Sequence, residues 1–160
     1  LAMIQGYCIG GGLATALGAD IRIATADSKF GIPAAKLGLG YGYEGLKTLA
    51  DLVGPASAKD ILFTARFLDA EEALRIGLIN FVVSREELEQ TVRDYAAMIA
   101  ANAPLTVKAA KAAVNEAMKD PDRRDLESVR GQVNACFDSQ DYKEGRRAFM
   151  EKRKPNFVGA

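Results

Sequence analysis

The chain has 160 residues, and its 21 lysines and arginines balance its 21 aspartates and glutamates. No overall charge therefore favours nucleic acid or an acidic membrane, and no apolar run reaches the length of a membrane span. The absence of histidine excludes His-dependent triads and His metal sites. Two cysteines are too few for a disulfide framework, and this composition suits a reducing cytoplasm. The chain starts without Met inside an apolar stretch, which predicts that it is a piece of a longer protein.

Strands and helices are predicted to alternate in the first part of the chain. The expected elements are a strand over 1–7, a small-residue helix over 13–18, a strand over 20–24, a turn at 27–28 and an extended piece over 30–33. The glycine-rich segment 37–45 follows and predicts a loop of the kind that often holds ligand-binding groups.

The rest of the chain is predicted to be mainly helical. The expected helices cover 46–53, 57–64, 69–77, 84–101, 104–118, 126–137 and a final stretch from 141 to about 155, with one strand over 78–83. Three pairs with capping-box spacing mark helix starts: Asp69 with Glu72, Ser84 with Glu87, and Asp141 with Glu144.

The run Ile9-Gly10-Gly11-Gly12 lies where the first strand meets the first helix. Glycines at a helix start expose unpaired N–H groups, which can receive a phosphate, a carboxylate or a thioester oxyanion, or can simply allow close packing. A dinucleotide-binding turn requires a third glycine where Thr15 stands, and no Gly-Lys-Ser/Thr of a P-loop follows. The third option is an oxyanion hole.

The order of motifs resembles the crotonase superfamily, also called the enoyl-CoA hydratase/isomerase family. The resembling stretches are Ile4-Gln5-Gly6, Gly10 to Gly12, Asp20 to Ala24, Phe30-Gly31, Leu37-Gly38, Phe63 to Ala65, Ala73 to Gly77 and Phe149 to Arg153. The resemblance covers the later portion of the family and implies an α/β fold: a partial spiral of ββα turns over 1–83, then a helical trimerisation region over 84–160. It implies homo-trimers or hexamers and an acyl-CoA substrate, without a metal, a separate cofactor, nucleic acid or a membrane as partner.

The resemblance also implies roles for individual residues. Gly11 would donate one of two backbone N–H bonds to the enolate oxyanion, and the other donor would lie upstream of Leu1. Gly10 and Gly42 would bind the substrate through their backbone atoms. Phe149 and Lys152 would cover the adenine and meet the phosphates of CoA, although a lysine there could equally lie on a solvated helix face.

Hydratases of the family place glutamates at the positions occupied here by Ala14 and Ala34. Hydration needs a base and an acid, so ordinary Glu/Glu hydration is doubtful. The pattern Leu37-Gly38-x-x-Tyr41 and the ending from Asp138 to Gly145 are similar to the methylmalonyl-CoA decarboxylase branch, in which a tyrosine faces the acyl group.

These residues favour decarboxylation of a malonyl-type CoA, with Tyr41 orienting the carboxylate. Tyr41 could instead simply pack under the loop. Glu44 could shuttle a proton, as in enoyl-CoA isomerases, or could stand at a helix start for the dipole. Hydration by other acids and a non-catalytic acyl-CoA-binding scaffold are further alternatives.

Overall fold

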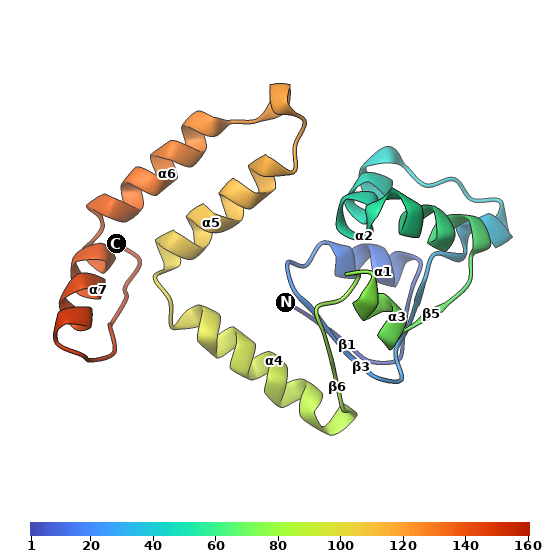
Figure 1. Ribbon diagram of the computed structural model, residues 1–160, viewed down its shortest axis with the longest axis horizontal. Helices are drawn as coiled ribbons and strands as arrows, with labels where there is room; N and C mark the ends of the chain where they lie inside the picture. Colours follow the sequence, from blue (N-terminus) through green and yellow to red (C-terminus); the bar gives the residue numbers. More distant parts are fainter. The chain divides into compact units, whose positions relative to one another are not determined.

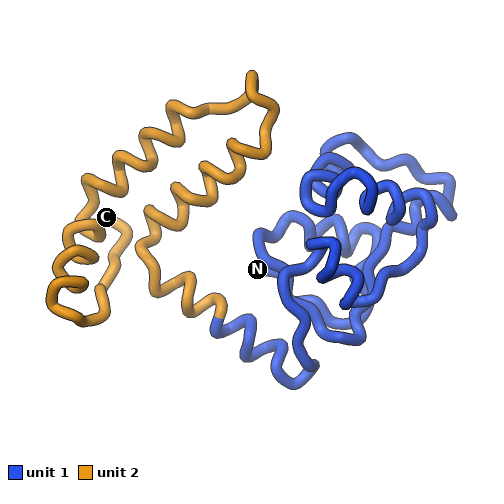
Figure 2. The backbone as a smooth tube through the Cα atoms, viewed as in Figure 1, with its two compact units in different colours: residues 1–94 blue, residues 95–160 orange.

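The computed structural model describes all of residues 1–160 and divides into two compact units, 1–94 and 95–160 (Figure 2). The division lies inside α4 (Arg85–Ala100). The domain limits expected from the sequence, 1–83 and 84–160, stay a prediction.

The first unit begins with two successive ββα turns. The first consists of β1 (Ala2–Ile4), β2 (Tyr7–Ile9) and α1 (Gly11–Leu17). The second consists of β3 (Arg22–Thr25), β4 (Lys29–Gly31), the short 3₁₀ helix η1 (Pro33–Leu37) and α2 (Tyr43–Thr64). Equivalent strands of the two turns pair in parallel, β1 with β3 and β2 with β4, so the backbone rises as a spiral. This confirms the expected α/β fold of ββα turns.

Two short strands, with a short helix between them in the chain, complete the two sheets of this unit (Figure 1). They are β5 (Leu68–Asp69), α3 (Ala70–Arg75) and β6 (Phe81–Val83). One sheet has the order β1-β3-β6 and is wholly parallel, whereas β5 pairs antiparallel with β4 at the edge of the other.

The core of this unit draws one or more side chains from each helix and sheet. Leu13 of α1, Phe30 of β4, and Leu49 and Ile61 of α2 are completely buried. Each such side chain stabilises the fold by about 1.5–3 kcal/mol relative to an exposed one. Helices α1 and α2 are thereby held in fixed positions beside the strands that precede them.

Glycines with positive φ explain where the observed elements differ from the predicted ones. The single strand expected over 1–7 is two strands, because Gly6 lies between them at φ 73°. Helix α1 begins at Gly11, earlier than expected, because Gly10 at φ 56° turns the chain directly from β2 into the helix. Gly54 (φ 77°, ψ 159°) separates α2 into two helical segments, which confirms the predicted break at 54–55.

The second unit contains helices joined by short loops (Figure 1). After the last residues of α4 it has α5 (Pro104–Ala117), the 3₁₀ turn η2 (Pro121–Arg123), α6 (Leu126–Asp138) and α7 (Gln140–Met150). Helix α5 packs along α6, and α6 contacts α7. The structure has no helix of the length and apolarity required to cross a membrane.

The predicted cap of the last helix is wrong. Ser139, not Asp141, caps α7, because its hydroxyl oxygen accepts a hydrogen bond from the N–H of Tyr142 at 3.0 Å. The carboxylate of Asp141 is buried and instead accepts the N–H groups of Val158 and Gly159 at 2.7 and 2.9 Å. Asp141 therefore binds the C-terminal tail to α7.

Candidate active site

The glycine turn presents free N–H groups, as the sequence predicts. Gly10 donates its own N–H to the carbonyl of Gly31 at 2.9 Å and accepts from Ala14 at 3.0 Å. Gly11 and Gly12 are the first residues of α1, are exposed, and have no side-chain cap and no backbone acceptor for their N–H groups. The start of this helix is therefore open to an acceptor from outside the chain.

The loop after η1 brings Tyr41 to this turn. A Cβ placed on Gly10 would lie 4.0 Å from the Tyr41 hydroxyl oxygen. The ring is half-buried and packs against the core, whereas its hydroxyl makes no hydrogen bond within the chain. The ring of Tyr41 therefore packs in the core, and its hydroxyl remains a free donor beside the glycine turn.

A small cavity of about 160 Å³ lies between α1, α2 and the loop that joins η1 to α2. Tyr41 lines it together with Ala14, Leu17, Gly18, Ile32, Gly45 and Thr48. Sequence reasoning singled out Tyr41 and Ala14 but missed the other five, because they come from separate segments with no common motif.

Glu44 and Gly42 lie at the start of α2. Gly42 is the N-cap residue, and a Cβ placed on it would be 3.7 Å from a carboxylate oxygen of Glu44. Glu44 is exposed in the first turn of the helix and does not line the cavity. Its carboxylate is thus near the free N–H groups of its own helix, where a negative charge is stabilised.

Ala34, at one of the two positions where hydratases of the family carry a glutamate, and Cys8, one of the two cysteines, are both buried. Ala34 lies within η1 and is 8% exposed, so its position carries only a methyl group in the core. Cys8 of β2 is buried, and burial raises the pKa of its thiol, which disfavours the reactive thiolate. Nowhere do His, Cys, Asp and Glu side chains gather in a group of three that could hold a metal ion.

Phe149 and Lys152 belong to the second unit. Phe149 is 82% exposed at the end of α7, and Lys152 follows with φ 53° in a turn closed by its N–H to the Phe149 carbonyl. Lys152 makes no ion pair within the chain, so its ammonium group is available to an anion. The sequence predicted both residues for CoA binding.

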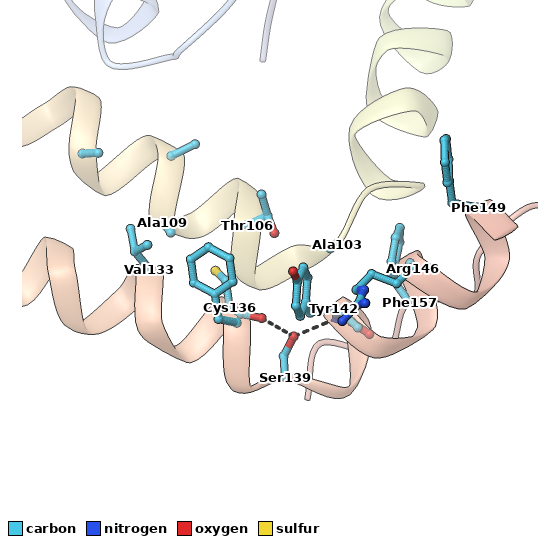
Figure 3. Close-up of a pocket in the computed structure, with 15 residues that line it drawn as sticks. Ala103, Thr106, Ala109, Val133, Cys136, Ser139, Tyr142, Arg146, Phe149 and Phe157 are labelled. Atoms are coloured by element: carbon cyan, nitrogen blue, oxygen red, sulfur yellow. Dashed lines mark hydrogen bonds between the residues drawn. The ribbon is translucent and has the colours of Figure 1, made fainter.

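An apolar pocket of about 630 Å³ lies between α5, α6 and α7 (Figure 3). Cys136, Tyr142 and Phe157 line its middle, and Phe149 stands at one end. The volume is in the range of ligand pockets, but almost no polar atom faces it. Its walls suit an apolar partner better than a phosphate.

Charged groups fix the turn that carries Lys152. Glu144 of α7 pairs with Arg153 and Arg147, both at 2.6 Å, and also accepts the N–H of Asn156 at 3.0 Å. The hydrogen bonds from Arg153, then from Arg147 and Asn156, hold the pKa of Glu144 far below its ordinary range. The carboxylate therefore stays charged and ties the tail to α7.

Comparisons with known proteins cover this whole chain. The model of a family described as enoyl-CoA hydratase/isomerase matches residues 1–160. The chain is 43% identical over 158 residues to crotonyl-CoA hydratase of Syntrophomonas wolfei subsp. wolfei, which covers 99% of this chain and 61% of that protein. It is 36% identical over 165 residues to methylmalonyl-CoA decarboxylase of Escherichia coli, covering 99% and 62%.

The backbone is similar to that of solved structures. An enoyl-CoA hydratase/carnithine racemase from Magnetospirillum magneticum superimposes with a TM-score of 0.90 and 36% identity, over 98% of this chain and 59% of that one. The chain thus spans about three-fifths of the length of these two curated relatives.

Proposed function

Since this chain belongs to the enoyl-CoA hydratase/isomerase family, the crotonase superfamily, we propose that the whole protein acts on an acyl-CoA thioester through an enolate. Gly11 donates its N–H to the enolate oxyanion at the positive end of α1. A second donor comes from a segment outside residues 1–160. The free N–H groups of the glycine turn support this role.

The reaction that we propose is decarboxylation of a malonyl-type CoA. The bond between C2 and the carboxylate breaks, CO₂ leaves, and the electron pair forms the enolate, which then takes a proton from solvent at C2. Tyr41 orients the departing carboxylate through its hydroxyl. The observation that carries this proposal is the position of that hydroxyl, which lies beside Gly10 and has no partner in the chain.

The lack of acid–base groups supports decarboxylation over Glu/Glu hydration. Hydration requires one group to activate water and another to protonate carbon. The two positions at which the family's hydratases carry glutamates hold Ala14, which lines the cavity, and Ala34, which is buried. Decarboxylation generates its own carbanion, so orientation and oxyanion stabilisation are sufficient.

Isomerisation through Glu44 is the second candidate. Glu44 is the one carboxylate in the glycine-rich segment, and it lies three residues from Tyr41. Glu44 does not line the cavity beside Tyr41, which favours the decarboxylase proposal.

Coenzyme A binding and assembly form part of the same proposal. The exposed ring of Phe149 covers the adenine, and the unpaired ammonium group of Lys152 meets a phosphate. The assembly is a homo-trimer or hexamer, and the two free cysteines suit work in the cytoplasm.

The Tyr41→Phe variant of the whole protein tests the reaction. We expect release of CO₂ from methylmalonyl-CoA to fall about a hundredfold, because the carboxylate loses the group that orients it. Tyr43→Phe is the matched control, since Tyr43 is 65% exposed two residues away and should keep parental activity.

Three results would contradict the proposal. Unchanged CO₂ release in Tyr41→Phe would remove the role of Tyr41. Conversion of 3-enoyl-CoA that disappears in Glu44→Gln would assign isomerisation instead. No turnover of malonyl-type, 3-enoyl or 2-enoyl CoA by the parent would identify a non-catalytic scaffold.

A further inference from the structure

We propose that Arg22 is a positioning residue for the oxyanion donor Gly11. Its buried guanidinium holds the C-terminal end of α1 and places a positive charge behind the helix that presents the Gly11 N–H. This inference rests on the proposed function, because it takes Gly11 to bind an enolate oxygen. It adds to that function a residue that strengthens the oxyanion site from inside the fold.

Arg22 carries its charge into the interior of the first unit. It is the first residue of β3, the central strand of the sheet β1-β3-β6, and is 3% exposed. The side-chain oxygen of Asn80 accepts the Arg22 N–H at 2.8 Å, and the Asn80 N–H donates to the Arg22 carbonyl at 2.9 Å. The backbone of Arg22 is therefore fixed on both sides, and its side chain starts from a rigid base.

The guanidinium binds main-chain carbonyls at the ends of two helices. Its Nη1 donates at 2.5 Å to the carbonyl of Ala19, which follows Gly18, the C-cap residue of α1. Its Nε donates at 2.8 Å to the carbonyl of Leu78, which lies shortly after the end of α3. Carbonyls at the C-terminal end of a helix carry partial negative charge, so a cation is stabilised there. The end of α1 is thereby tied to the chain that follows α3.

The burial of this charge indicates a use beyond filling space. Burial lowers the pKa of Arg22, and Asp20 acts in the opposite direction, but an arginine stays protonated at neutral pH in any case. A buried charge is costly to desolvate, and a hydrophobic side chain of similar volume often stabilises a fold equally well. Such a side chain would not supply a positive charge at the end of α1.

The charge lies at the opposite end of α1 from the proposed oxyanion donor. The helix runs from Gly11 to Leu17, so about 10 Å of helix separates its two ends. The buried Leu13 and Ala16 fix the side of α1 in the core, whereas Arg22 fixes its C-terminal end. Because the protein interior screens charge less than water does, a positive charge at this distance stabilises a negative oxygen at Gly11.

The carbonyl carbon of bound propionyl-CoA reports this effect. Propionyl-CoA is the product of methylmalonyl-CoA decarboxylation and has no carboxylate to lose, so it can be bound to the whole protein without losing CO₂. With ¹³C at C1, its resonance should move downfield when the oxyanion donors polarise the carbonyl. We expect Arg22→Gln to reduce this movement and to lower kcat for CO₂ release about tenfold, with little change in the Kd of propionyl-CoA.

Two further variants separate the charge from stability. Arg22→Lys keeps the charge, so it should restore most of the downfield movement that Arg22→Gln loses. Thr25→Val is the matched control, because Thr25 is 1% exposed on the same strand and its hydroxyl bonds to Asp27 and Ser28 rather than to α1. This control should lower the Tm and leave the bound resonance and kcat as in the parent. Equal losses in Thr25→Val and Arg22→Gln would overturn the proposal.

Asp20→Asn tests the charge at an exposed position, whether or not Arg22→Gln folds. The carboxylate of Asp20 raises the pKa of Arg22, so it offsets part of the positive charge at the end of α1. Its removal should increase the downfield movement at low salt. An unchanged or smaller movement in Asp20→Asn would contradict the role of the charge.

The outcomes distinguish this inference from the function on which it rests. A resonance that moves equally in the parent and in folded Arg22→Gln would remove the role of Arg22 and leave Gly11 as the donor. A resonance that does not move when propionyl-CoA binds to the parent would overturn the oxyanion site and this inference together.

Discussion

The three positions of the glycine turn differ in how strictly their backbone conformation requires glycine. Gly10 adopts φ 56° and ψ −118°, a conformation that only glycine reaches without strain. Gly11 and Gly12 have ordinary φ values, and a Cβ on either would meet nothing within 4 Å of this chain. Backbone geometry therefore demands glycine at position 10, whereas the next two leave N–H groups uncovered.

Gly11→Pro tests the proposed donor directly. Proline is well tolerated at the first position of a helix, and it removes the single N–H that the mechanism uses. We expect kcat to fall by about a hundred- to a thousandfold with little change in Tm. Gly11→Ala retains the N–H and has room for its methyl group, so its fall in kcat should be at least tenfold smaller than that of Gly11→Pro. Equal activity of the two variants would exclude Gly11 as donor.

The C-terminal tail is bound to helix α7. Asp141 accepts two tail N–H groups, and the tail carbonyl of Ala160 accepts the N–H of Gln140 at 2.6 Å. Phe157 packs on Gly145, where an added Cβ would lie 3.5 Å from its ring. These contacts and the ion pairs of Glu144 fix the turn from which Phe149 and Lys152 project.

The ion pairs of Glu144 predict a specific pH dependence. Because its pKa is lowered in the fold, mainly by Arg153, its stabilisation is complete above the ordinary value of 4.5 and is lost as pH falls toward the folded value. Glu144→Gln should therefore lower Tm at pH 7. The difference in Tm between this variant and the parent should narrow steadily as the pH falls below 4.5. Glu127→Gln, which removes no ion pair, is the control. A difference that stays constant down to pH 2 would contradict this explanation.

Several large apolar side chains of the second unit are exposed. They include Val114 at 62%, Phe137 at 57% and Met150 at 81%. Such surfaces mark interfaces with other proteins. They support the trimer or hexamer that the family resemblance implies.

Light scattering on the whole protein tests this assembly. We expect a mass three or six times that of the monomer at micromolar concentration. Val114→Lys places a charge on the exposed face of α5 and should reduce that mass without emptying a core site. A parent that is monomeric at every concentration would contradict the prediction.

Local chemistry predicted most of the elements. The break of α2 at Gly54 and the Ser84–Glu87 capping box follow from residues near one another, and the structure contains both. The predicted cap of α7 is wrong because Asp141 has a partner 17 residues away, at Val158. Spacing within a helix carries no information about such a contact.

The sequence by itself determined the family, the ββα order and the glycine turn, because these depend on motif order and short-range backbone preferences. Only the tertiary structure decided which side chains share one space. It brought Tyr41 to Gly10 and left Glu44, in the first turn of α2, outside the cavity, although both belong to the glycine-rich segment 37–45. The physical reason is that packing of α1 against the start of α2 forms the cavity, and no single segment contains both walls.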